Sequence, residues 1–176
     1  MKVNIGEPVS LQEILLSREA RAKRISELIK KYSLPIISLT INIPGSVKLT
    51  QSSIKVFEEA CLYLENNLKN QIVFTDTSVF NTGCQAFFVI NGIDKDIKLF
   101  AVDFEDHHPL GRLVDVDVVN IDSEHISRES LGFQPRKCLI CDGKAKVCGR
   151  SRKHSVIDLV SKFDEIVSEW EKTYDC

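Results

Sequence analysis

The segment that most constrains the fold runs from residue 36 to residue 43 and reads IISLTINI. It is apolar and rich in β-branched residues, a composition that favours a strand covered by other elements. Pro35 blocks the continuation of a preceding helix, and Pro44-Gly45 forms a turn after the segment. The segment therefore predicts a buried strand in a layered domain.

Helical and strand patterns surround this segment. Ser10 and Glu13 form a capping-box pattern, and apolar residues then continue to Tyr32 at a period near 3.6, which predicts a first helix. Other patterns predict helices over about 51–69 and from Ser155 onward, strands over about 71–75, 85–91, 97–104 and 112–120, and a hairpin turn at Asn91-Gly92. We therefore expect an α/β (or α+β) fold, with a mixed β-sheet flanked by helices in a single domain over residues 1–176.

The composition excludes several classes of protein. No run approaches the roughly 20 apolar residues of a membrane helix, and residues 1–12 lack the apolar core of a signal peptide. The chain has six cysteines, and without a secretory signal we expect reduced thiols or a metal-binding subset in a cytoplasmic protein. The formal net charge of -2 argues against a protein that coats nucleic acid.

Two aspartates stand in an otherwise valine strand, VDVDVV at residues 114–119. Side chains alternate along a strand, so Asp115 and Asp117 share one face, with their Cα atoms about 7 Å apart. Mg²⁺, or Mn²⁺ in its place, prefers such oxygen ligands and shares them with substrate phosphates. Metal-dependent nucleotidyl transfer commonly needs such a pair, often with a third carboxylate from another strand. The alternative interpretation is a strand with one solvated face.

Opposite charges are concentrated in two neighbouring segments. Residues 93–125 contain nine acidic and three basic residues, a net charge of -6, whereas residues 128–153 contain eight basic and two acidic residues, a net charge of +6. The basic members are Arg128, Arg136, Lys137, Lys144, Lys146, Arg150, Arg152 and Lys153. An acidic metal site beside basic side chains is suited to a polyphosphate substrate. Alternatively, the two segments simply pair with each other.

A spacing of soft metal ligands lies within the basic segment 128–153: Cys138-x2-Cys141-x6-Cys148-x5-His154. A Cys-x2-Cys pair followed by two further soft ligands is typical of a structural zinc site. A metal would order a segment that is otherwise irregular. Three reduced cysteines without metal are an equal alternative. His154 could instead act as a catalytic base or donate a hydrogen bond to a phosphate.

These motifs, in their order along the chain, resemble the holo-acyl-carrier-protein synthase family of citrate lyase, also called apo-citrate lyase phosphoribosyl-dephospho-CoA transferase. The resemblance covers about residues 10–160. It rests on the blocks Arg18-Glu19 with Arg21, residues 35–45, Thr82-Gly83, residues 105–118, Ser127-Arg128, Leu131-Gly132, residues 135–141 and residues 148–155. The chain departs from the family pattern at Cys84-Gln85, where Pro-Glu is usual, at Val114, where an aromatic residue is common, and at Gln134, which replaces a proline.

The resemblance implies a nucleotidyltransferase-like fold and a specific reaction. The family transfers a phosphoribosyl-dephospho-CoA group from 2'-(5-triphosphoribosyl)-3'-dephospho-CoA to a serine of the citrate lyase acyl carrier subunit, and diphosphate leaves. On this basis Asp115 and Asp117 hold the divalent ion, and Asp103 is the candidate third carboxylate. Asp103 or His154 is the candidate general base. The candidate phosphate-binding residues are Arg112, Arg128, Arg136, Lys137, Arg150 and Arg152.

Two other hypotheses remain open from the sequence. One is a zinc-stabilised, non-enzymatic module in which Cys138, Cys141, Cys148 and His154 hold zinc and the basic segment binds an acidic protein or nucleic acid. The other is a related transferase for a different carrier, such as that of malonate decarboxylase. In the preferred interpretation the partners are the acyl carrier subunit and triphosphoribosyl-dephospho-CoA, with neither a membrane nor a nucleic acid involved. A small acidic carrier would dock on the basic face of the first helix or on residues 128–153.

Overall fold

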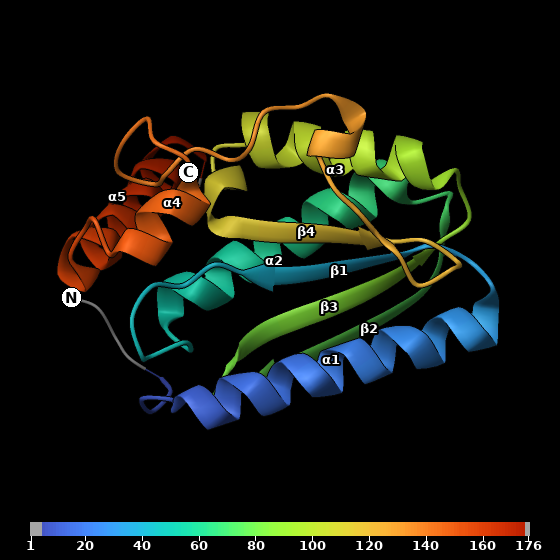
Figure 1. Cartoon of the computed structure of the whole chain (residues 1–176), viewed down its shortest axis with the longest axis horizontal. Helices are drawn as coiled ribbons and strands as arrows, with labels where there is room; N and C mark the ends of the chain where they lie inside the picture. Colours follow the sequence, from blue (N-terminus) through green and yellow to red (C-terminus); the bar gives the residue numbers. More distant parts are fainter. Residues whose placement is uncertain (1–4, 175–176) are drawn as a thin grey trace.

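A five-stranded sheet with strand order β2-β3-β1-β4-β5 forms the centre of the computed structural model, which describes residues 5–174 (Figure 1). The strands are β1 (Ile36–Ile41), β2 (Ile72–Phe80), β3 (Gly83–Ile90), β4 (Val114–Val119) and β5 (His125–Ile126). The helices are α1 (Leu11–Tyr32), α2 (Gln51–Leu68), α3 (Asp94–His107), α4 (Ala145–Ser151) and α5 (Val156–Tyr174), with short 3-10 helices η1 (Gly111–Leu113) and η2 (Glu129–Leu131). The predicted layered α/β arrangement is confirmed.

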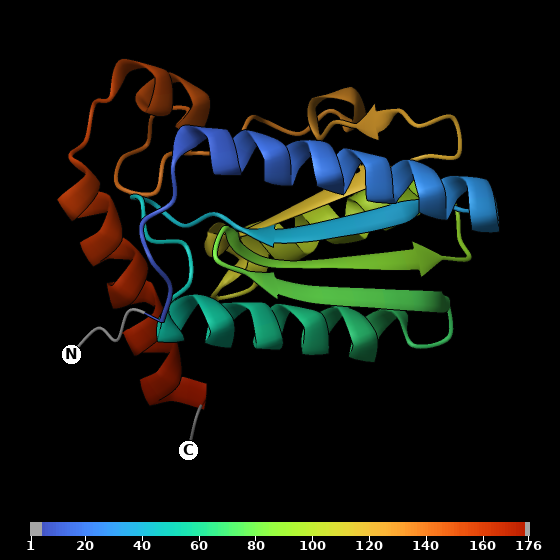
Figure 2. The same ribbon diagram turned by 90° about the horizontal axis from the view of Figure 1, so that it is seen from below.

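Helices cover both faces of the sheet (Figure 2). Alternate residues of β1 separate the two layers: Ile37 and Leu39 pack with apolar residues of α2, α3 and α5, whereas Ile36 packs under α1. These three β1 side chains are completely buried, as the apolar pattern of residues 36–43 predicts. Among the helices of residues 5–174, none is long and apolar enough to cross a membrane.

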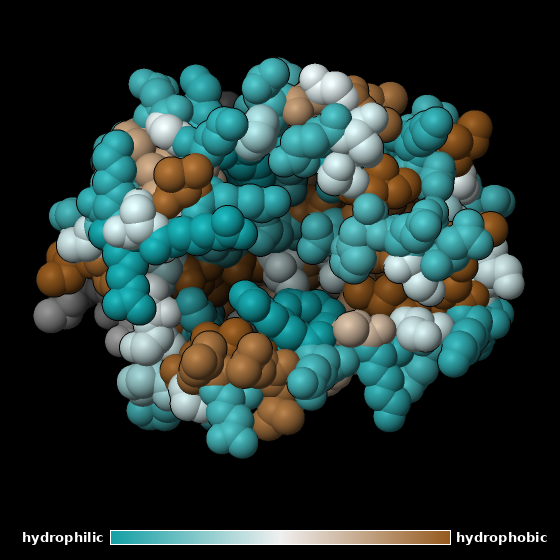
Figure 3. Space-filling view, viewed as in Figure 1, coloured by the Kyte–Doolittle hydropathy of each residue, from teal (hydrophilic) through white to brown (hydrophobic). Residues whose placement is uncertain are grey.

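The first helix covers only part of its face of the sheet. Ser10 and Glu13 form the predicted capping box, and Ser33 ends the helix in a left-handed conformation. The buried residues of α1 all lie in its second half, where Leu28 and its neighbours pack on Ile36, Phe87, Val89 and Val119. The first half has no buried residue and exposes Leu11, Leu15 and Leu16, and Figure 3 shows a hydrophobic patch over this part of the helix.

Three local predictions were wrong. Residues 97–104 are not a strand but part of α3, because Ile97, Ala101 and Phe104 recur at helical spacing and are buried together against the sheet. Asn91-Gly92 leads from β3 into α3, and the hairpin instead joins β2 to β3, where Phe80 pairs with Gly83. The sheet is not mixed, since every pairing of the described strands is antiparallel.

Side chains of α3 complete the outer edge of β4. The short strand β5 pairs only with Val118 and Val119, so it leaves the rest of that edge uncovered. At Val116 the backbone N–H donates to Glu105 Oε1 over 2.9 Å, and the carbonyl accepts from Lys98 Nζ over 3.1 Å. Both side chains are buried, so they satisfy backbone groups that would otherwise lack a partner at this edge.

Candidate active site

The acidic pair Asp115 and Asp117 lies on the face of the sheet that α1 covers only in part. The register places Thr40 beside Asp115 and Ser38 beside Asp117. The intervening Val114, Val116 and Val118 are buried on the opposite face. The expectation that both carboxylates share one face is therefore confirmed, and they form an acidic strip next to polar residues of β1.

Asp115 sits in a strongly polar environment. Its carboxylate accepts from Arg136 Nη1 over 2.5 Å. Desolvation raises the pKa of the Asp115 carboxyl, Arg136 opposes that rise, and the negative charge of Asp117 adds to it. The side chain still has 48% of its surface exposed, so it remains accessible to solvent. A carboxylate that is partly desolvated and accessible is suited to bind a cation.

A cavity of about 490 Å³ adjoins the acidic pair, and we call it the groove. It lies between β4, α3 and the segment that follows β5. Its basic lining residues are Lys98, Arg112, Arg128, Arg136, Lys137 and Lys146, and its carboxylates are Glu105, Asp115, Asp117 and Glu129. Cations therefore outnumber carboxylates around the groove, and the acidic pair forms one side of it. This charge distribution can hold a polyphosphate together with a divalent cation.

Two arginines connect the segment after β5 to the start of β4. Arg136 donates to the carbonyls of Val114 over 2.9 Å and of Gly111 and Arg112 over 3.2 Å each. Arg112 in turn donates to the carbonyls of Lys137 and, over 2.9 Å, of Cys138. These reciprocal hydrogen bonds fix Arg136 and Lys137 beside the acidic pair, where residues far apart in the sequence meet.

Glu105 and Lys98 are site residues that the sequence interpretation missed. Glu105 Oε2 accepts from Arg128 Nη2 over 2.8 Å, and Arg128 also contacts Asp106 over 3.1 Å. Arg128 is itself buried, so part of its charge is neutralised by the protein. Lys98 and Glu105 are seven residues apart and lie on one side of a helix, a spacing that would have grouped them if residues 97–104 had been predicted as helical.

We expect Glu105→Gln to lower the free energy of unfolding by about 3 kcal/mol, because it leaves the buried Arg128 guanidinium short of a carboxylate. Urea denaturation would measure the change. Asp106→Asn is the matched control, since Asp106 pairs with the same arginine but is 35% exposed, and its effect should be clearly smaller. Equal stability of Glu105→Gln and the wild type would contradict the structural role of this ion pair.

Several predicted site residues lie away from the groove. Asp103 belongs to α3 rather than to a strand, and its exposed carboxylate contacts His107 Nδ1 over 2.8 Å. Arg150 on α4 and Arg152 at its C-terminal cap are exposed and do not line the groove. They follow the other basic residues in sequence, but the α4 turn directs this part of the chain to solvent. The structure thus groups Arg112, Arg128, Arg136 and Lys137 with the acidic pair and leaves Asp103, Arg150 and Arg152 outside.

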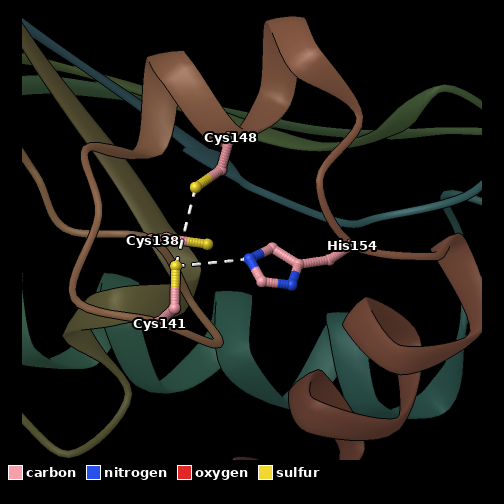
Figure 4. A group of neighbouring side chains, drawn as sticks. All are labelled: Cys138, Cys141, Cys148 and His154. Atoms are coloured by element: carbon pink, nitrogen blue, oxygen red, sulfur yellow. Dashed lines mark hydrogen bonds between the residues drawn. The ribbon is translucent and has the colours of Figure 1, made fainter.

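The cysteine cluster consists of Cys138, Cys141, Cys148 and His154, whose side chains point toward one another (Figure 4). One potential ligand atom of each residue lies within 4.8 Å of all the others. Cys141 Sγ is 3.6 Å from Cys148 Sγ and 3.3 Å from His154 Nε2. These four residues could hold a metal ion, and three thiolates with one imidazole are a ligand set typical of zinc. His154 therefore lies in the cysteine cluster rather than among the residues that line the groove.

The other described cysteines are chemically different. Burial raises the pKa of the Cys61 thiol to about 12 and that of the Cys84 thiol to about 11. Both therefore stay protonated near neutral pH and belong to the apolar core. The cysteines of residues 5–174 are free thiols, and Cys176 lies outside the described residues.

A layered α/β domain that presents an acidic pair beside a basic groove is suited to an enzyme of the class that transfers phosphorus-containing groups. Comparisons with known proteins narrow this class. The profile of the family described as apo-citrate lyase phosphoribosyl-dephospho-CoA transferase matches residues 9–170. The chain belongs to this family.

Individual relatives agree with this assignment. A protein of Vibrio cholerae named as a probable apo-citrate lyase phosphoribosyl-dephospho-CoA transferase is 36% identical over 166 residues, which cover 92% of this chain and 93% of the relative. A protein of the same name from Streptococcus pyogenes is 34% identical over 92% of this chain and 87% of its own length. Protein CitXG of Leuconostoc mesenteroides is 35% identical over 96% of this chain, but the match covers only 37% of that longer protein.

Proposed function

We propose that the protein transfers the phosphoribosyl-dephospho-CoA group from 2'-(5-triphosphoribosyl)-3'-dephospho-CoA to a serine of the citrate lyase acyl carrier subunit. The observation that carries this proposal is the acidic pair beside a basic groove, in a chain of this family. The serine oxygen forms a bond to the phosphorus nearest the ribose, and the bond from that phosphorus to the departing diphosphate breaks. The hydroxyl proton is released, and the product is a phosphodiester.

The residues that line the groove would have different roles in this reaction. Asp115 and Asp117 would hold Mg²⁺ or Mn²⁺, an ion that neutralises charge on phosphate oxygens when bound. Arg112 and Lys137 line the same groove and are suited to bind the phosphates. Arg136 orients Asp115 and holds the segment after β5 against β4. The two candidate bases suggested by the sequence, Asp103 and His154, both lie outside the groove.

The cysteine cluster would hold a structural Zn²⁺. Its position supports this role, because Cys138 directly follows Lys137 and offers its carbonyl to Arg112. The backbone N–H of Cys138 also donates to the Gly143 carbonyl over 2.6 Å, which closes a tight loop around Cys141. A metal in the cluster would therefore fix the residues that carry the basic side of the groove.

The partner we propose is the acyl carrier subunit, and the compartment we propose is the cytoplasm, in keeping with the free cysteines among residues 5–174. The family and relative names describe a transferase, and nothing in these comparisons supports a non-enzymatic binding module.

Incubation with the apo-carrier and the triphosphoribosyl donor, with and without Mg²⁺, tests the function directly. We expect the intact mass of the carrier to rise by one phosphoribosyl-dephospho-CoA group only when the metal is present. The carrier of malonate decarboxylase, tested with the same donor, examines the related reaction. Unmodified citrate lyase carrier in the presence of enzyme, donor and metal would refute the proposal.

A further inference from the structure

Three basic side chains gather on the α1 side of the acidic pair, away from residues 128–137. Arg18 and Arg21 belong to α1, and Lys48 belongs to the loop between β1 and α2. Lys48 packs against the turn between β2 and β3, because a Cβ at Gly83 would lie 3.9 Å from the Lys48 Cβ, and Ser17 on α1 contacts Thr82 in the same turn. The charge of Arg18 lowers the pKa of both Arg21 and Lys48, after the larger effect of burial on each, whereas the charges of Asp117 and Asp115 raise the pKa of Arg21.

The contacts of α1 explain how Arg21 reaches this position. Ser17 Oγ lies 3.2 Å from Thr82 Oγ1 in the turn between β2 and β3, and Arg24 pairs with Asp76 on β2. Both contacts lie within about one helical turn of Arg21 and place its side of α1 toward the sheet. The helix thus runs over β2 and β3, on one side of the acidic pair. Arg136 approaches Asp115 from the other side, beyond the edge of β4.

None of these three cations forms a direct ion pair with another described residue. Within residues 5–174, no carboxylate forms an ion pair with Arg18, Arg21 or Lys48, and the Lys48 ammonium donates to the Ile43 carbonyl. Arg21 and Lys48 are only half-exposed, so water does not fully screen their mutual repulsion. Bringing like charges together under partial burial costs free energy, and a bound anion would remove that cost.

We propose that Arg18, Arg21 and Lys48 form a second phosphate-binding site, which holds the diphosphate end of a polyphosphate on the α1 side of the acidic pair. Identifying that polyphosphate as the triphosphoribosyl donor rests on the proposed function. A substrate would then lie between two basic sides, one formed by α1 and one by residues 128–137, with the acidic pair between them. Each basic group on the α1 side can donate to phosphate oxygens, and the two guanidinium groups can do so through paired N–H groups.

Titration calorimetry with inorganic diphosphate, in the presence of Mg²⁺, tests this site without the carrier or the donor. We expect Arg21→Gln and Arg18→Gln each to weaken diphosphate binding about tenfold or more, since each removes a charged hydrogen-bond donor. Arg18 is exposed, so Arg18→Gln should fold normally even if Arg21→Gln does not. Lys23→Gln is the matched control, because Lys23 is exposed on the side of α1 away from the sheet, and its affinity should equal that of the wild type.

The outcomes separate this inference from the proposed function. Wild-type diphosphate affinity in folded Arg18→Gln and Arg21→Gln would overturn the site. The same unchanged affinity combined with weaker binding to the carrier would show that these cations dock a protein instead, which also overturns it. Diphosphate binding that depends on Arg21, in a protein that never modifies the carrier, would support the site and count against the proposed function alone.

Discussion

Asp117→Asn should reduce the rate of group transfer to the carrier about a thousandfold, or about 4 kcal/mol in activation free energy. The substitution keeps the size of the side chain but removes the negative charge that a divalent cation needs. Asp117 is exposed on β4 and forms no ion pair among the described residues, so the fold should be unaffected. Asp115→Asn should lose a comparable amount of activity and also the ion pair to Arg136. The measurement is the initial rate of carrier modification at saturating Mg²⁺.

Asp122→Asn is the matched control for this experiment. Asp122 is an exposed carboxylate in the turn after β4, it does not line the groove, and its substitution should leave the rate unchanged. Circular dichroism would confirm that all three variants are folded. If Asp117→Asn transferred the group at the wild-type rate, the acidic pair would not be the metal site.

The second large effect is expected at the cysteine cluster. Purified protein should contain about one zinc per chain, and Cys141→Ser should abolish that content because it removes one of four ligands. The same substitution should lower the free energy of unfolding by several kcal/mol, since the binding of a structural metal contributes directly to folding. The transfer activity of Cys141→Ser should also fall, because the carbonyls of Lys137 and Cys138 accept hydrogen bonds from Arg112 and hold it beside the acidic pair. Elemental analysis and thermal unfolding with and without a chelator provide the measurements.

Cys61→Ala serves as the control, because Cys61 packs against the core, is not one of the four cluster residues, and has a thiol that stays protonated. Cys61→Ala should keep its zinc content, although the loss of a packed side chain should lower its thermal stability slightly. A wild-type protein that is purified without metal and unfolds identically with and without chelator would show that the four residues are not a metal site.

The helices and strands with regular sequence patterns could be predicted, and the irregular ones could not. The first, second and last helices have apolar residues at a clear helical period, and β1 is a short apolar run between prolines. Residues 97–102 contain five apolar residues out of six, so period alone could not distinguish α3 from a strand. Only the structure, which shows the residues of α3 that are buried against the sheet, identifies this segment as a helix.

The site was predictable where neighbours in sequence are neighbours in space. Alternation along a strand placed Asp115 and Asp117 together, and the ligand spacing identified the cysteine cluster. Glu105 and Lys98 could not be found in this way, because their role depends on which edge of β4 is left open. The basic segment also suggested Arg150 and Arg152 as phosphate-binding residues, but both lie outside the groove. The charge of a residue does not show which way its part of the chain faces.

The side chains that complete the β4 edge also affect how the protein behaves among other chains. An uncovered strand edge can recruit a strand of another molecule, the first step of domain swapping and of fibril growth. Here Glu105 and Lys98 already occupy the backbone groups of Val116 that an incoming strand would need. The protein can therefore keep the strand that carries the acidic pair next to solvent without offering that strand as a template for aggregation.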